Sequence, residues 1–201
     1  MERLVLEPGA PWDAAVKRAA SVLREGGVAL LPAEGVYGLH ALAEDSAAVE
    51  RLRSLKPRPE EKSYIGLIAD VGEIDRWAVP DPRALELARE HWPGALTLVL
   101  RAGPSMPESM RNAEGTVALR CPGNPFLRSV VTEISGIVLS TSANHPGELP
   151  LIRPEGALAE RVDLVVDQGA LSGDPSTVVA IEGELVRVLR EGAVRLRGRH
   201  T

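Results

Sequence analysis

The chain has 201 residues, 44% of them hydrophobic, and a formal net charge of −5, so it can bury a substantial core. The acidic balance argues against a general nucleic-acid coat protein, although it permits a local basic cleft. The single cysteine excludes an internal disulfide, the four histidines lack zinc-type spacing, and neither a membrane span nor a signal-peptide core is apparent, so we expect a cytoplasmic protein.

Helical and extended patterns alternate without a linker, which predicts one α/β domain over residues 1–201, with a twisted, mixed β-sheet flanked by helices. Apolar residues at helical spacing, with caps and glycine stops, predict helices over residues 12–23, 46–55, 82–91, 125–134 and near 154–160. Short apolar runs predict strands over residues 28–31, 64–69, 95–100, 116–120, 137–139, 164–166, 177–181 and 185–189. The last two lie too close together for a parallel crossover, so we expect antiparallel pairing there.

Only three of the 23 basic residues are lysines, and two of them, Lys56 and Lys62, flank Arg58 at the end of a predicted helix. Two ammonium groups and a guanidinium in so short a stretch are suited to binding a polyphosphate. A solvated turn, in which Glu60 and Glu61 neutralise the lysines, is the alternative. The helix dipole by itself also favours a cation at the position of Lys56.

Two further polar clusters follow predicted strands, where open α/β sheets bind ligands. The glycines of residues 32–39 permit close approach of a ligand to the backbone, although a plain glycine-rich turn has the same composition. Residues 140–144, with the sequence Ser-Thr-Ser-Ala-Asn, offer hydroxyl and amide groups to a polar ligand or to hydrated magnesium. Ordinary turns and helix caps use the same residue types.

Arg120 and Arg190 each end a predicted strand, where a guanidinium can bind a carboxylate or phosphate with two hydrogen bonds. Either is equally compatible with an ordinary surface position. No G-x-S-x-G elbow surrounds the serines of residues 140–144, and the chain contains no Walker-type phosphate loop or dinucleotide fingerprint. A serine hydrolase and the commonest nucleotide-binding folds are therefore not supported.

Seven short motifs in fixed order identify a family resemblance that covers nearly the whole chain. They read P-x-E-x-V-Y-G-L, K-x-R-P-x-x-K, W-P-G-x-L-T-L, T-V-A-x-R, S-T-S-A-N, S-T-V-V and L-R-x-G, at residues 32–39, 56–62, 92–98, 116–120, 140–144, 176–179 and 189–192. In this order and spacing they resemble the YrdC/YciO-like family, and the chain looks like its short, single-domain form.

The resemblance implies a fold with a deep, positively lined cavity and an activity of L-threonylcarbamoyl-AMP synthase. Such enzymes combine ATP, L-threonine and bicarbonate into threonylcarbamoyl-adenylate and release pyrophosphate, with Mg²⁺ carried by ATP rather than by a protein ligand cluster. Their product serves the t6A modification of tRNA position 37, which makes tRNA and the downstream transfer machinery the implied partners.

Roles are carried over to the residues that match each motif. The ATP and phosphate group comprises Lys56, Arg58, Lys62, Thr116, Ser142, Asn144 and Arg190. The threonine group comprises Arg120, which would bind the carboxylate, with Gly35, Ser140 and Ser176 around the amino acid. A reaction that depends on alignment and charge neutralisation requires no catalytic cysteine or histidine.

The first motif departs from the family pattern, which usually reads P-T-E-T-V-Y-G-L-G. Ala33 and Gly35 replace both threonines, and His40 replaces the last glycine. If a water fills the space beside Gly35, threonine remains a possible substrate, and a Gly35→Thr substitution is then expected to improve threonine binding. The alternatives are a YciO-like paralogue that binds double-stranded or structured RNA or acts on the ribosome, and an enzyme for another amino acid.

Overall fold

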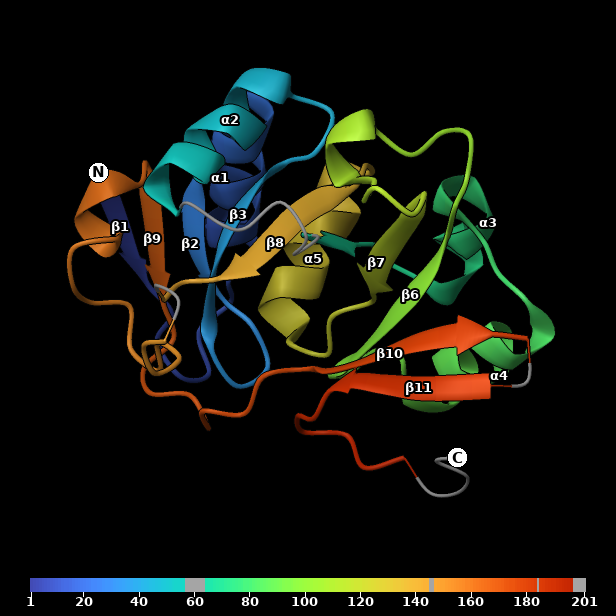
Figure 1. Cartoon of the computed structure of the whole chain (residues 1–201). Coiled ribbons are helices and arrows are strands. Elements are labelled where there is room, and N and C mark those ends of the chain that lie inside the picture. The colour runs from blue at the N-terminus through green and yellow to red at the C-terminus, as the bar shows by residue number, and fades with distance from the viewer. Residues whose placement is uncertain (57–63, 145–146, 184, 197–201) are drawn as a thin grey trace.

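A computed structural model describes residues 1–56, 64–144, 147–183 and 185–196 as a twisted, open, mixed β-sheet with helices on both faces (Figure 1). The strand order is β1 (Glu2–Val5), β9 (Leu164–Asp167), β2 (Ala29–Pro32), β3 (Tyr37–Leu42), β8 (Val138–Ser142), β4 (Ile65–Leu67), β7 (Thr116–Arg120), β6 (Leu96–Ala102), β10 (Thr177–Glu182) and β11 (Leu185–Arg190). The short strand β5 (Ala78–Val79) pairs with β6 outside this order. None of the helices in the described ranges has the length and hydrophobicity that a membrane crossing requires.

The centre of the sheet is formed by β3, β8, β4 and β7, which are far apart in sequence. β8 pairs antiparallel with both β3 and β4, whereas β4 and β7 run parallel. The register places Ser140 of β8 opposite both His40 of β3 and Ile65 of β4. Because β8 is antiparallel to β4, the polar end of β8 lies next to the start of β4, whereas Arg120, at the end of β7, is level with the start of β8.

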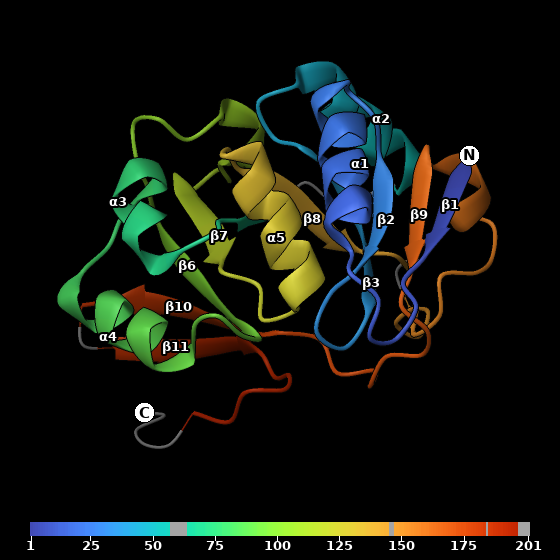
Figure 2. The same ribbon diagram turned by 180° about the vertical axis from the view of Figure 1, so that it is seen from behind.

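Helices α1 (Asp13–Arg24) and α5 (Pro125–Ile134) cover one face of the sheet, the face toward the viewer in Figure 2. Each is amphipathic and buries its apolar side in a shared hydrophobic cluster with β2 and β8. The rings of Trp12 and Phe126 meet edge to face, with centroids 6.4 Å apart.

Helix α2 (Ser46–Leu55) lies on the opposite face, and its buried residues belong to the larger hydrophobic cluster. Asp45 caps it by accepting hydrogen bonds from the backbone N–H groups of Ala47 and Ala48. Near β6 the same cluster takes in α3 (Ile74–Trp77) and α4 (Pro82–His91). Three short 3₁₀ turns complete the elements, at Val71–Glu73, Glu108–Met110 and Ala159–Arg161.

The expected fold class is confirmed, although several elements differ from those expected, and α3 and β5 were not predicted. The helix predicted near residues 154–160 is wrong: only the final 3₁₀ turn is present, because Gly156 takes the left-handed conformation (φ +92°), which interrupts a helix. Strand β1 was not predicted. Strand β3, which begins within the first motif, is a buried strand where a glycine-rich turn was expected, although Tyr37, Leu39 and Ala41 alternate with Gly38 and His40 as in a strand.

Asn124 and Asp81 form a matched pair of caps, because each precedes a proline at the start of a helix. Asp81→Ala removes one cap hydrogen bond and should lower the free energy of unfolding by about 1 kcal/mol. Asn124→Ala also removes the bonds that its side-chain amide donates to the Ala33 carbonyl and to Gln168, so we expect a loss of about 2–3 kcal/mol. Chemical denaturation measures both, and equal losses would contradict the structural role of the Asn124 amide.

Candidate functional site

One pocket opens at the centre of the sheet, where the loop after β2 meets the ends of β8, β7 and β11. It contains about 420 Å³ of empty space, including the part open to solvent. Its walls are Ala33, Glu34, Gly35, Val36, Gly38, Ile65, Arg120, Ser140, Thr141, Ser142, Asp174, Pro175, Ser176 and Arg190. The pocket thus combines residues from six separate stretches of the chain.

Arg120, at the end of β7, is almost fully buried and pairs with Glu34 of the loop after β2. The Arg120 Nη1 and Glu34 Oε2 atoms are 3.0 Å apart, and Glu34 Oε1 accepts a hydrogen bond of 2.6 Å from the backbone N–H of Gly123. Among the described residues, Arg120 Nε has no hydrogen-bond partner. Glu34 therefore fixes the position of a guanidinium that also lines the pocket.

Arg190, at the end of β11, is anchored to the start of β10. Its Nε and Nη2 atoms donate to the Ser176 carbonyl at 3.0 and 2.7 Å, and Nη2 also donates to Ser176 Oγ at 2.9 Å. Ser176 Oγ lies 2.9 Å from Thr97 Oγ1 of β6. The second guanidinium of the pocket is thus positioned by a buried network of hydroxyls.

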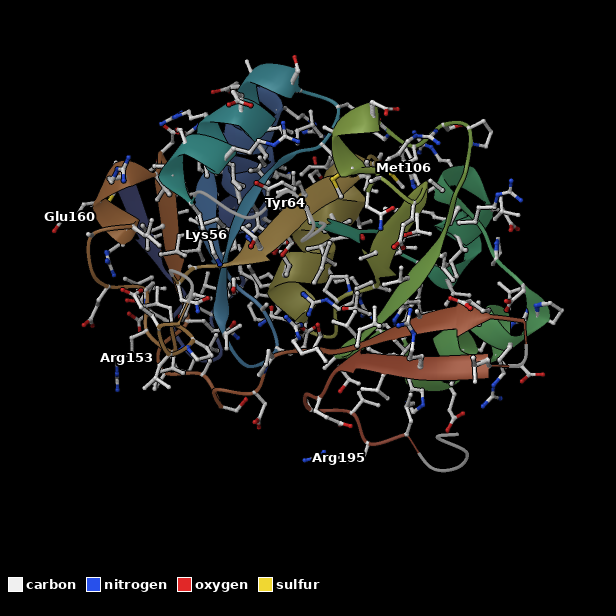
Figure 3. All side chains as sticks on the ribbon, viewed as in Figure 1. Lys56, Tyr64, Met106, Arg153, Glu160 and Arg195 are labelled. Atoms are coloured by element: carbon white, nitrogen blue, oxygen red, sulfur yellow. The ribbon has the colours of Figure 1, made fainter. Side chains whose placement is uncertain are left out.

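Lys56 immediately follows α2, and its ammonium group turns toward the end of β8, as Figure 3 shows. The Nζ atom donates to the Ser142 carbonyl at 2.6 Å, to Ser142 Oγ at 3.0 Å and to Asn144 Oδ1 at 3.5 Å. The side chain is buried, so the interpretation of this lysine as part of a solvated turn is wrong. Contact between the lysine motif and the Ser-Thr-Ser-Ala-Asn motif joins two of the predicted clusters.

Gly35 contacts the backbone of the segment before β10. Gly173 N donates to Gly35 O at 2.7 Å, and a Cβ atom at Gly35 would lie only 2.1 Å from Asp174 O. On its other side this segment meets Gly192, where a Cβ atom would lie 2.4 Å from Pro175 O. The space that a water was expected to fill beside Gly35 is therefore occupied by backbone, and the expectation that Gly35→Thr improves binding is replaced by its opposite.

His40 is fully buried in β3, beneath the pocket. Its Nε2 atom lies 3.2 Å from Ser140 Oγ. Burial first, and then the positive charge of Arg120, lowers the pKa of His40 to about 3, so the imidazole is neutral at physiological pH.

The structure brings together most of the residues singled out from the sequence. The residues that line one pocket are Gly35, Arg120, Ser140, Ser142, Ser176 and Arg190; Lys56 is joined to it through Ser142, and Asn144 through Lys56. Thr116 lies at the opposite end of β7 from Arg120, roughly 13 Å away at about 3.3 Å per residue, and does not line the pocket. Arg58 and Lys62 lie outside the described residues.

The expected positive lining needs correction for the described part of the cavity. Two arginines line it, but so do Glu34 and Asp174. The Glu34 carboxylate is paired with Arg120, so its negative charge offsets that arginine. An incoming anion meets a pocket whose cations are already oriented by protein groups.

Three further site residues were not assigned from the sequence: Glu34, Thr97 and His40. Each contacts an assigned residue, namely Arg120, Ser176 and Ser140. Thr97 and His40 are polar residues inside apolar runs that form buried strands, a pattern that is costly unless the polar group is partnered. A polar residue within an apolar strand is therefore the sequence feature by which Thr97 and His40 could have been found.

Comparison with known proteins identifies the family. The Sua5/YciO/YrdC sequence model, described as telomere recombination, matches residues 21–192. The chain belongs to the Sua5/YciO/YrdC family. It is 28% identical over 192 residues to the uncharacterized protein YciO of Escherichia coli, covering 93% of each chain, and 33% identical over 189 residues to the threonylcarbamoyl-AMP synthase of Bacillus subtilis. The second match covers 90% of this chain and 54% of the Bacillus protein, about half its length.

Solved structures of the Sua5/YciO/YrdC family share the fold. The crystal structure of E. coli YciO superposes with a TM-score of 0.87 at 26% identity, over 96% of each chain. Sua5 of P. abyssi, crystallised with L-threonine, gives a TM-score of 0.84 at 29% identity, over 95% of this chain and 57% of Sua5. The family therefore includes both a protein of unknown activity and proteins named for a threonine-dependent synthesis.

The close contact at Gly35 predicts that side chains are excluded there. Gly35→Ala should lower the free energy of unfolding by about 1–3 kcal/mol, and Gly35→Thr should lower it further, because the Asp174 backbone must move. Thermal and chemical denaturation measure the loss.

Gly72→Ala is the matched control, because its Cβ atom would approach only the Asp70 side chain, at 3.2 Å. We expect the free energy of unfolding of this variant to lie within about 1 kcal/mol of that of the parent protein. Higher stability or tighter threonine binding in Gly35→Thr would contradict the predicted exclusion.

The buried neutral His40 predicts a loss of stability in mild acid. The native pKa of about 3 lies below the unfolded value of 6.5, so below pH 6.5 only the unfolded state takes up the proton. The free energy of unfolding should fall by about 1.4 kcal/mol per pH unit, or about 2 kcal/mol between pH 6.5 and 5.

His40→Leu removes this proton-linked loss and serves as the comparison for chemical denaturation at pH 5, 6 and 7. Above pH 6.5 both states are neutral at this position, so the contribution vanishes there. Identical pH dependence in the two proteins would contradict the assignment of a neutral, buried imidazole.

Proposed function

We propose that this protein is an L-threonylcarbamoyladenylate synthase, an enzyme of the nucleotidyl-transfer kind that makes threonylcarbamoyl-AMP and pyrophosphate from L-threonine, bicarbonate and ATP. The observation that carries the proposal is the convergence of two oriented guanidinium groups, Arg120 and Arg190, in one pocket beside the buried ammonium of Lys56. A reaction between anions requires such a concentration of fixed positive charge. Support also comes from the naming of the Bacillus subtilis relative and from the L-threonine in the structure of P. abyssi Sua5.

The pocket has two chemically different ends in this proposal. Arg120, with Ser140 and Ser176, binds the amino-acid carboxylate, whereas Lys56 and Arg190 bind the phosphates of ATP. Arg58 and Lys62 remain predicted members of the phosphate end. In this division the threonine carboxylate and the ATP phosphates bind to different cations.

Magnesium would enter with ATP. Among the described residues, no group of three or more His, Cys, Asp or Glu side chains is arranged to hold a metal ion. Mg²⁺ usually retains several waters and binds through substrate phosphates, which suits the oxygens of Ser142 and Asn144 as outer partners. When bound, the ion would neutralise part of the negative charge of the ATP phosphates.

The proposed reaction has two steps. The threonine amine and bicarbonate form a carbamate and water. A carbamate oxygen then attacks the α-phosphorus of ATP, the bond from that phosphorus to the β-phosphate oxygen breaks, and pyrophosphate leaves. The protein aligns the two anions and stabilises the developing charge, with Arg190 beside the leaving group.

A second candidate function follows from the similarity to YciO over the whole described fold and from the changed first motif. The backbone at Asp174 occupies the space next to Gly35, where the family pattern usually has a threonine. In that case the protein is a paralogue that binds structured RNA through phosphate contacts. Its binding would weaken steeply with salt and would not depend on threonine.

The deciding experiment incubates the protein with ATP, Mg²⁺, bicarbonate and L-threonine, and separates the products by chromatography. Threonine-dependent formation of the adenylate and pyrophosphate is expected. If no adenylate forms with threonine and the protein binds double-stranded RNA in a salt-sensitive way, the second candidate function replaces the first.

Two arginines of β11 provide a matched test of the phosphate end. Arg190→Ala should lower kcat/KM by about a hundredfold, because it removes a fixed donor from the developing charge. Arg187→Ala, at an exposed position on the same strand, should leave turnover unchanged. Steady-state kinetics measure both, and similar losses in the two variants would show that Arg190 has no specific role.

A further inference from the structure

His40 occupies a position that neither the family pattern nor the proposed chemistry explains. It lies in β3 directly opposite Ser140 of β8 and has no exposed surface. The neighbouring Gly38 leaves room for its ring, since a Cβ atom at Gly38 would lie 2.9 Å from His40 Cε1. The sequence therefore accommodates a buried polar ring immediately below the pocket floor.

The ring contacts the pocket through one side chain. Ser140 lines the pocket, and its Oγ atom lies 3.2 Å from His40 Nε2. A serine hydroxyl otherwise chooses among three staggered rotamers, and a buried partner favours the one that makes the hydrogen bond. His40 thus limits the directions in which Ser140 can present its remaining donor or acceptor capacity.

Burial, and then the positive charge of Arg120, keeps the ring neutral. The ring therefore contributes a hydrogen bond without adding charge. An amino-acid carboxylate bound at Arg120 would then meet a preoriented hydroxyl at Ser140. The loop after β2 offers no such hydroxyl, because Ala33 and Gly35 have none.

We propose that His40 is a positioning residue that orients the Ser140 hydroxyl, so that the floor of the pocket provides polar recognition of the amino acid in place of the loop after β2. This inference rests on the proposed function, because it concerns the amino-acid end of the same site. The specificity of that end then depends on a contact between two central strands.

The test is a double-mutant cycle on threonine binding, measured by calorimetry and by the KM for threonine and for ATP. His40→Leu and Ser140→Ala should each weaken threonine binding about fivefold to tenfold and change the KM for ATP less than twofold. The double variant should bind no more weakly than Ser140→Ala alone, because His40 acts through Ser140. His40→Gln, which retains a polar group near the Nε2 position, should recover most of the affinity.

Each contrary result has a distinct meaning. Losses that multiply in the double variant, or that affect ATP and threonine equally, would overturn the positioning role. If the wild-type protein binds threonine and His40→Leu binds it equally well, this inference alone is overturned. Failure of the wild-type protein to bind threonine would overturn the proposed function together with the inference that rests on it.

Discussion

The ion pair between Arg120 and Glu34 is the interaction on which the geometry of the site depends. Both groups are largely removed from water, and an unpaired charge in such a position is strongly unfavourable. Glu34 also accepts the hydrogen bond from Gly123, so one carboxylate joins the loop after β2 to the end of β7 and to the turn before α5. Displacing it would disturb two walls of the pocket and the adjacent turn before α5.

Two further cations of the site donate hydrogen bonds to carbonyl and hydroxyl oxygens. Arg190 donates to Ser176, and Lys56 donates to the end of β8. Such hydrogen bonds fix the direction in which a cation points. The site therefore gathers three oriented cations, one of which is paired with a carboxylate, and the proposed amino-acid and phosphate ends are built on this arrangement.

Most of the fold follows from local sequence signals. The caps at Asp45, Asp81 and Asn124 marked three helices correctly, because capping depends on a few adjacent residues. The ordered motifs indicated the family, and most of the residues singled out from them lie in or beside one pocket. Strand β3 was not predicted because the glycines of residues 32–39 were interpreted as a turn, although Tyr37, Leu39 and Ala41 alternate with Gly38 and His40 as in a strand.

The contacts within the site were less accessible from sequence. Arg120 and Arg190 were identified by type and position, but the pairing with Glu34 depends on a loop that folds back across the sheet. The same reason explains the reversal at Gly35: its neighbour, Asp174, is distant in the chain, and no local pattern reports that approach. Long-range backbone packing is the part of the site that required the structure.

The segment between Gly173 and Ser176 passes between two glycines, Gly35 and Gly192, and contacts the backbone of both. This arrangement constrains how the protein can evolve a different substrate preference. A side chain gained at either glycine collides with the segment unless the segment moves first, so the two changes must be acquired in a particular order. Divergence at the amino-acid end is therefore more accessible through the floor of the pocket, where single substitutions alter polarity without moving the main chain.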